Sequence, residues 1–266
     1  MPIKKEYTIE SIKYYIDLFE QVKEHNKSNG NNADLIFRGQ PIDKPLLPKL
    51  ARIELEGTMA TMEKLMLDEF KRGSLPLTEF KPENNWDWLA LAQHHGLPTR
   101  LLDWSYSALA ALWFAVEKVP LKDDKGKFEN GVVWILSALV EDFRTNTEST
   151  DPLSNKITKV FRSTVVSRRI SAQAGLFTVH KINADGKMIK FETKKEFKDK
   201  LTKAIIPYGQ FASIRKQLHI LEVNNSTIFP DIDGFCRHLE WRYSKYSDEK
   251  GSDGSALTPS SIGKPK

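Results

Sequence analysis

The sequence contains little cysteine, no long hydrophobic run and only a small excess of positive charge. Cys236 is the single cysteine, so the chain can form no internal disulfide and no cysteine metal cluster, which agrees with a reducing compartment. No residue near it in the sequence would activate it as a nucleophile, so a buried, unreactive thiol is expected. The longest apolar stretch, residues 108–116, is about half of what a membrane span requires. Because the N-terminus also lacks a secretory pattern, we expect a cytoplasmic protein without membrane partners.

The charge balance limits the partners that the surface favours. The chain has 40 Lys and Arg residues against 35 Asp and Glu residues, a net charge of +5 over 266 residues. Such a mildly basic surface favours anionic partners such as a nucleotide or a nucleic acid. The lysines between residues 181 and 203 are interleaved with acidic residues, which is typical of a solvated helix or hairpin rather than of a nucleic-acid groove.

Hydrophobic periodicity predicts one mixed domain. Apolar residues at helical spacing, together with Gly and Pro breaks, predict helices at 8–25, 54–71, 87–95, 109–116, 211–222 and 231–243. Apolar, β-branched or alternating segments predict strands at 35–37, 131–136, 175–180 and 204–207. We expect a single domain over 1–246, composed of the helix at 8–25, a core at 33–182 and a C-terminal helical portion at 204–246. Residues 141–158 should form a surface loop and residues 247–266 a disordered tail.

Two details of these helices follow from the same patterns. Thr8 is the expected N-cap of the first helix. The second helix should bury an apolar stripe made of Leu55, Met59, Met62, Leu65, Met66 and Phe70.

Arg38 stands at the end of a short predicted strand and is followed by Gly39. A guanidinium fixed in this way can hold a phosphate or a carboxylate, and a glycine beside it lets the backbone approach a ligand. The tripeptide alone does not exclude the alternative interpretation, in which Arg38 is paired with a carboxylate in the core.

The richest polar segment lies between two predicted helices and reads Gln93-His94-His95-Gly96-Leu97-Pro98-Thr99-Arg100-Leu101-Leu102-Asp103-Trp104. Polar side chains gathered at a helix end are costly to hold without a purpose, so this segment is the strongest candidate for a site. A metal is not expected, because adjacent histidines point apart on a helix and no further soft ligand is near. In the alternative, structural interpretation, Asp103 caps the next helix and Gln93 bonds loop backbone groups.

Five segments together resemble the FRG domain, which is named after its Phe-Arg-Gly tripeptide. They are Phe37-Arg38-Gly39-Gln40, the 93–104 segment, the 108–115 helix with Phe114, the 131–136 strand and Ala172-Gln173-Ala174-Gly175-Leu176-Phe177-Thr178. The resemblance spans about residues 8–182 and, at its widest extent, includes Phe229-Pro230-Asp231.

FRG domains in turn resemble distant members of the ADP-ribosyltransferase superfamily, whose enzymes cleave the nicotinamide–ribose bond of NAD. The resemblance implies an α+β fold with a split antiparallel β core surrounded by helices. It also implies that NAD is the substrate and that Arg38 clamps its phosphate or ribose. In that superfamily a second motif, a strand rich in Ser and Thr followed by a helix, forms the wall of the pocket. The resemblance assigns this role to Thr99, Asp103, Trp104 and Ser105. Residues expected to contact NAD are Arg38, Gly39, Gln40, Gln93, His95, Thr99, Arg100, Trp104, Ser105 and Phe114.

The third motif of that superfamily normally supplies a glutamate, and this sequence departs from it. Gln173 stands at the matching strand, and a glutamine can orient a substrate but cannot offset the positive charge that grows on the ribose. The acid would then come from Asp103, or else from Glu222 or Glu240, or catalysis is lost. A histidine can share the clamping role, and His94 is preferred to His95 because it lies nearer the anchored helix. The candidates for catalysis are therefore Arg38, His94, Asp103 and Gln173.

Three functions remain open from the sequence. The first is an NAD-dependent ADP-ribosyltransferase that modifies RNA or protein, acting as a toxin or phage-defence effector that a neutralising antitoxin protein could hold in check. The second is a binding module that recognises a nucleotide through Arg38 without catalysis. The third is a nuclease that uses His94, His95 and Asp103.

Overall fold

The computed structural model describes residues 5–78, 82–145, 147, 149–163 and 168–249. Over these residues it is a mixed α/β fold built on a mostly antiparallel sheet with the strand order β1-β7-β4-β2-β3-β6-β5, in which only the β1–β7 pair is parallel. The described strands are β1 (Glu6–Thr8), β2 (Asp34–Gln40), β3 (Leu101–Ser105), β4 (Gly131–Ala138), β5 (Lys159–Phe161), β6 (Gly175–Val179) and β7 (Leu201–Ile206).

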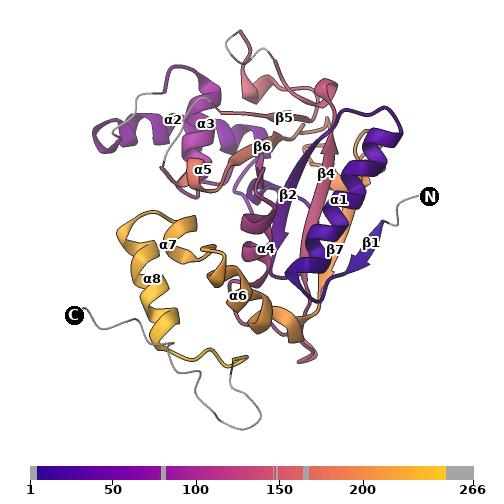
Figure 1. The fold of residues 1–266 in the computed structure, drawn as a ribbon. Coiled ribbons are helices and arrows are strands. Elements are labelled where there is room, and N and C mark those ends of the chain that lie inside the picture. The colour runs from indigo at the N-terminus through magenta and orange to yellow at the C-terminus, as the bar shows by residue number, and fades with distance from the viewer. Residues whose placement is uncertain (1–4, 79–81, 146, 148, 164–167, 250–266) are drawn as a thin grey trace.

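Helices pack on both halves of this sheet (Figure 1). The described helices are α1 (Ile12–Ser28), α2 (Met59–Ser74), α3 (Asn85–His94), α4 (Ala108–Val116), α5 (Arg168–Ala172), α6 (Phe211–Ile220), α7 (Asn225–Ile228) and α8 (Ile232–Tyr243). Helices α1, α4 and α6 share one core cluster with β2, β4 and β7, whereas α2 and α3 share another with β3, β5 and β6. Among the described residues, no helix is both long enough and apolar enough to cross a membrane.

Most predicted elements are present, but three strands were not predicted. β1 ends at Thr8, the residue where the first helix was predicted to begin, so Thr8 is not the N-cap; Ser11 caps α1 instead and accepts from the N–H of Tyr14. β3 falls inside the segment predicted as a loop between two helices. β5 falls just after the predicted 141–158 loop, which contains only short 3₁₀ turns in its described part.

The apolar stripe predicted for α2 is half-buried at most of its positions, but it does not include the most buried residues of the helix. Leu65 is 51% exposed, whereas Leu67 and the carboxylate residue Glu63 are buried. Glu63 reaches the buried guanidinium of Arg100, with 2.6 Å between Arg100 Nη2 and Glu63 Oε2. The core-facing side of α2 thus includes a buried ion pair.

Two further expectations were wrong. Cys236 is exposed on α8, because the buried face of that helix is formed by Gly234 and His238. Residues 248 and 249, which were assigned to the tail, contact the fold: Asp248 and Glu249 both form ion pairs with the buried Arg215 of α6. The rest of the predicted tail, residues 250–266, lies outside the described residues.

Candidate functional site

The site lies where the sheet separates between β2 and β3. These two strands share one paired position, Phe37 with Ser105, whereas β2 pairs with β4 over seven positions and β3 with β6 over five. A cavity of about 650 Å³ opens at this separation. Its volume falls within the range of small-molecule and cofactor pockets, roughly 300–1,000 Å³.

The floor of the cavity follows from strand alternation. Ser105 pairs with Phe37, and Asp103 pairs with Phe177, so these four side chains share one face of the sheet. In β3 the flanking residues are buried and Asp103 alone is exposed. A carboxylate is therefore presented to the cavity from an otherwise buried strand.

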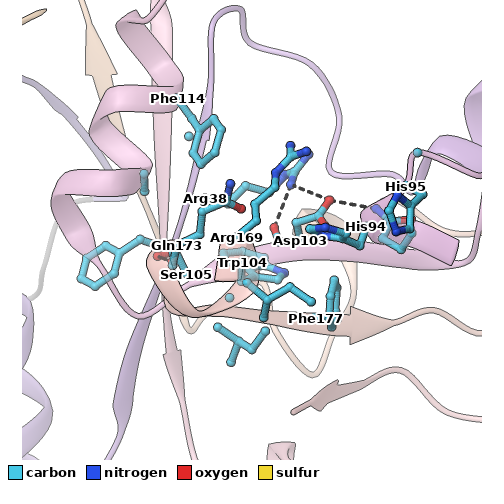
Figure 2. Close-up of a pocket in the computed structure, with 18 of the residues that line it drawn as sticks. Arg38, His94, His95, Asp103, Trp104, Ser105, Phe114, Arg169, Gln173 and Phe177 are labelled. Atoms are coloured by element: carbon cyan, nitrogen blue, oxygen red, sulfur yellow. Dashed lines mark hydrogen bonds and ion pairs between the residues drawn. The ribbon is translucent and has the colours of Figure 1, made fainter. Parts of the chain in front are cut away.

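Arg38 occupies the separation itself. Its Nη1 donates to the backbone carbonyl of Asp103 at 2.7 Å and lies 3.8 Å from the carboxylate oxygen Oδ2 of the same residue. The side chain is 17% exposed, and its buried Nε has no hydrogen-bond partner. Burial lowers the pKa of Arg38 from its usual value, and the Asp103 carboxylate opposes this effect. The guanidinium thus keeps donors available beside the cavity (Figure 2).

A chain of hydrogen bonds fixes the Asp103 carboxylate. The side-chain amide of Gln93 donates to Asp103 Oδ2 at 2.9 Å. Thr99 Oγ1 donates to Gln93 Oε1 at 2.6 Å and accepts from the N–H of Leu101 at 3.1 Å. Gln93 and Thr99 therefore hold Asp103 beside Arg38. The proposed capping role of Asp103 is not observed, because Ser107 caps α4.

The two histidines lie at the C-terminal end of α3 with their ring centroids 4.9 Å apart, in an edge-to-face arrangement. Burial, reinforced by the charges of His95 and Arg169, lowers the pKa of His94 to about 4. His94 is therefore neutral at pH 7, and it could accept a proton but not donate one as an imidazolium. Among the residues that the structure describes, no group of three or more His, Cys, Asp or Glu side chains could hold a metal ion.

Ser105 joins the β3 wall to the turn before β6. Its hydroxyl donates to the backbone carbonyl of Gln173 at 2.6 Å, and the N–H of Tyr106 bonds the carbonyl of Ala174 at 2.9 Å. Ala174 has a φ of 46°, a left-handed conformation that is unfavourable for a residue with a side chain. The Gln173 amide donates to the carbonyl of Ile228 at 3.2 Å, so this residue connects the turn to α7.

The remaining wall comes from the C-terminal part of the chain. Asp231, the N-cap of α8, and Arg169 of α5 both line the cavity. The ring of Phe229 lies 4.3 Å from the Arg169 guanidinium, and its centroid is 5.8 Å from that of Trp113 and 6.2 Å from that of Phe114. These contacts fix α7 and α8 against α4 and α5.

The structure brings together most of the predicted site residues. Those that line the cavity are Arg38, Gly39, Gln93, His94, His95, Asp103, Trp104, Ser105, Phe114 and Gln173. Gln40, Thr99 and Arg100 do not line it. Gln40 accepts from the indole N–H of Trp134, Thr99 is buried beneath Gln93, and Arg100 is paired with Glu63 and bonds the carbonyls of Pro152 and Leu153.

Other lining residues were not predicted as site residues. Arg169 carries no sequence signal, because α5 has five residues and no clear periodicity. Asp231 was noted within the resemblance and as a helix start but was not assigned a role. The proposed alternative acids Glu222 and Glu240 do not line the cavity, because they lie after α6 and on α8.

Trp104 is connected through Thr178 to a buried histidine, His180. The Trp104 indole N–H donates to Thr178 Oγ1 at 3.1 Å, and Thr178 Oγ1 lies 3.0 Å from His180 Nε2. His180 is fully buried, and its Nδ1 has no partner. Burial lowers the pKa of His180 to about 3 from an ordinary value of 6.5. The folded protein therefore holds this ring neutral.

We predict that His180 makes the fold sensitive to acid. The unfolded chain takes up a proton below about pH 6.5 and the folded chain does not, so stability is lost as the pH falls from 6.5 toward 3. Between pH 7 and pH 5 the expected loss from this group is about 2 kcal/mol. Urea unfolding at pH 7, 6 and 5 should show this slope in the wild type. It should be flatter in His180→Gln and unchanged in His25→Gln; an identical slope in His180→Gln would contradict the assignment.

The fold and the site together define a mixed α/β protein with a polar cavity at a separation between two central strands. Residues 33–124 match the family model of the FRG domain, which confirms over this range the resemblance that the motifs indicated. The matched range includes Arg38, Gln93 and Asp103 but ends before α5, β6 and α8. No curated protein and no solved structure matches the chain.

Proposed function

We propose that the chain binds NAD in the β2–β3 cavity and transfers its ADP-ribose group to a macromolecular acceptor, RNA or protein. The observation that carries the proposal is Arg38, a largely buried guanidinium with unused donors at the wall of a nucleotide-sized cavity. A phosphate or ribose oxygen would supply the acceptor that Nε lacks. The separation of the sheet at this point agrees with the split β core that an ADP-ribosyltransferase-like fold would have.

The residues around Arg38 fit this chemistry in named roles. Asp103 is the carboxylate nearest to Arg38 and is oriented by Gln93, so it can stabilise positive charge that develops on the ribose. Phe114 and Phe177 provide aromatic surface for a planar ring. Gln173 would orient the ligand through its side-chain oxygen or its second amide N–H, because one N–H of the same nitrogen donates to Ile228.

The first test is binding of NAD to Arg38→Lys, measured by calorimetry. Lysine keeps the charge, but its single ammonium nitrogen cannot reproduce the planar set of donors with which a guanidinium bonds the Asp103 carbonyl through one nitrogen and a ligand through another. We expect the Kd for NAD to rise on the order of 10–100-fold, which corresponds to about 1.5–3 kcal/mol for charge-assisted hydrogen bonds. Arg72→Lys, an exposed change of the same kind on α2, should leave the Kd unchanged. An unaltered Kd in Arg38→Lys would refute the proposed clamp.

The second test is catalysis. Labelled NAD is incubated with the purified chain and either total cell RNA or cell lysate, and both transfer of label and release of nicotinamide are measured. Expression in cells of the wild type beside Arg38→Ala tests the associated role as a toxin or defence effector, because only the wild type should arrest growth. Absence of transfer and of nicotinamide release, under conditions where expression is toxic, would exclude the transferase.

A non-catalytic nucleotide-binding module is the second candidate, and one observation favours it. Among the described residues that line the cavity there is no glutamate, and Asp103 is already engaged by Gln93 and lies close to Arg38. Tight NAD binding without nicotinamide release would support this module over the transferase. No observation specifically favours the nuclease.

A further inference from the structure

The cavity has a second carboxylate, which comes from the start of a helix and not from the sheet. Asp231 reaches it from the N-terminus of α8, whereas Asp103 reaches it from β3. The two carboxylates differ in their surroundings. Asp103 Oδ2 accepts from Gln93 and faces Arg38, but Asp231 takes part in no ion pair among the described residues.

Only one oxygen of Asp231 is used by the fold. Its Oδ1 accepts from the N–H of Gly234 at 2.7 Å, the N-cap bond of α8. The residue is exposed, so Oδ2 can receive a hydrogen bond from a group that enters the cavity from outside. Arg38 by contrast is 17% exposed and belongs to the deep end.

The backbone at Asp231 is held firmly. Phe229, two residues earlier, packs against Trp113 and Phe114 and lies between the guanidinium groups of Arg169 and Arg237, at 4.3 and 4.9 Å. The Gln173 amide bonds the carbonyl of Ile228. Figure 1 shows α7 and α8 together beside α6, on the outside of the molecule. A carboxylate in this position is fixed relative to the cavity and open to a large partner.

Arg169 adds a cation to the same wall. The charges of Asp103 and Asp231 both raise the pKa of Arg169 against the larger effect of burial, so the guanidinium lies within electrostatic range of both carboxylates. It is oriented by stacking on Phe229. Asp231 and Arg169 thus present a negative and a positive group on the wall that an incoming macromolecule meets first.

We infer that Asp231 is the residue that receives the acceptor: it accepts a hydrogen bond from the acceptor's hydroxyl or amino group and takes its proton during transfer. This inference rests on the proposed function. In the step, the bond between ribose C1′ and nicotinamide nitrogen breaks, and its electron pair leaves with neutral nicotinamide. The acceptor oxygen or nitrogen forms the new bond to C1′, and its proton passes to the Asp231 carboxylate. Arg169 favours an acceptor with a phosphate or carboxylate next to the reacting group.

The experiment compares wild type, Asp231→Asn, Asp231→Ser and Asp233→Asn. Asparagine and serine cap a helix about as well as aspartate, so both variants keep α8 while they remove the carboxylate. Asp233 is an exposed acidic residue in the first turn of the same helix that does not line the cavity, which makes it the matched control. Each protein is assayed for the Kd of NAD, for nicotinamide release without acceptor, and for transfer to cell RNA or lysate.

The expected result is a loss confined to transfer. Removing a general base costs about 100-fold or more, so transfer should fall by that order in both Asp231 variants, whereas the Kd for NAD should stay within about twofold. Asp233→Asn should match the wild type in all three assays. Equal transfer by Asp231→Asn and wild type would overturn the inference but not the proposed function. A parallel loss of NAD affinity would assign Asp231 to NAD instead. If the wild type neither binds NAD nor releases nicotinamide, the proposed function fails, and the inference fails with it.

Discussion

Replacing Glu63 by alanine should lower the free energy of unfolding by about 3–5 kcal/mol, because it leaves the Arg100 guanidinium charged and buried without its partner. Arg100 and Glu63 are 2% and 1% exposed, and Glu63 also accepts from the Arg100 backbone N–H at 2.8 Å. Loss of one carboxylate thus removes a salt bridge and the acceptor for a buried N–H.

Denaturant unfolding of Glu63→Ala measures this effect. The control is Asp34→Ala, which breaks an ion pair with Arg162 whose side chains are 59% and 53% exposed; solvent screening limits its cost to no more than about 1 kcal/mol. The double replacement Glu63→Leu with Arg100→Met should recover most of the stability, since it removes both charges. A loss in Glu63→Ala no larger than that in Asp34→Ala would show that the buried pair is not needed.

Gly39→Ala should be comparably damaging for a different reason. A Cβ at this position would lie 1.8 Å from the carbonyl oxygen of Ala111 and 2.8 Å from its carbon, both backbone atoms of α4. Helix α4 or strand β2 must therefore move, and we expect a loss of about 3 kcal/mol in stability. NAD binding should weaken as well, because β2 carries Arg38 and α4 carries Phe114.

Gly73→Ala is the matched control. Gly73 lies within α2, and a Cβ added there would point into open space with no neighbouring atom within 4 Å, so alanine should stabilise the protein by about 0.5–1 kcal/mol. Thermal unfolding and calorimetry with NAD compare the two variants. If Gly39→Ala is as stable as the wild type and binds NAD equally, close packing of α4 on β2 does not position the site. The sequence suggested that Gly39 serves approach to a ligand; the structure places it at the cavity wall and also shows that it packs closely against α4.

The motifs predicted the lining of the cavity better than they predicted the secondary structure that forms it. The cavity lining includes Arg38, Gln93, Asp103 and Gln173. These residues could be predicted from the sequence because their polar side chains stand out within apolar or glycine-rich surroundings. β3 was missed because four of its five residues are buried and only Asp103 is exposed, so its sequence shows no alternation of apolar and polar positions. Arg100 was predicted as a site residue because it lies within the polar motif, but it is buried in the core and paired with Glu63.

The contribution of the C-terminal half could not be predicted for a physical reason. Asp231 reaches the cavity through contacts of Phe229 with Trp113 and Phe114, which are more than a hundred residues away in the chain. Local periodicity contains no information about such contacts. It predicted the last helix from Asp231 correctly but not the surface on which that helix would pack.

The cavity therefore depends on segments that extend well beyond the matched region. A fragment limited to residues 33–124 would keep Arg38 and Asp103 but lose β4, the strand that pairs with β2 along its whole length. It would also lose α5 and α8, leaving the deep arginine facing solvent. The matched region thus supplies only part of the cavity wall. Experiments on ligand recognition need the chain through at least Glu249, whose carboxylate anchors α6 through Arg215.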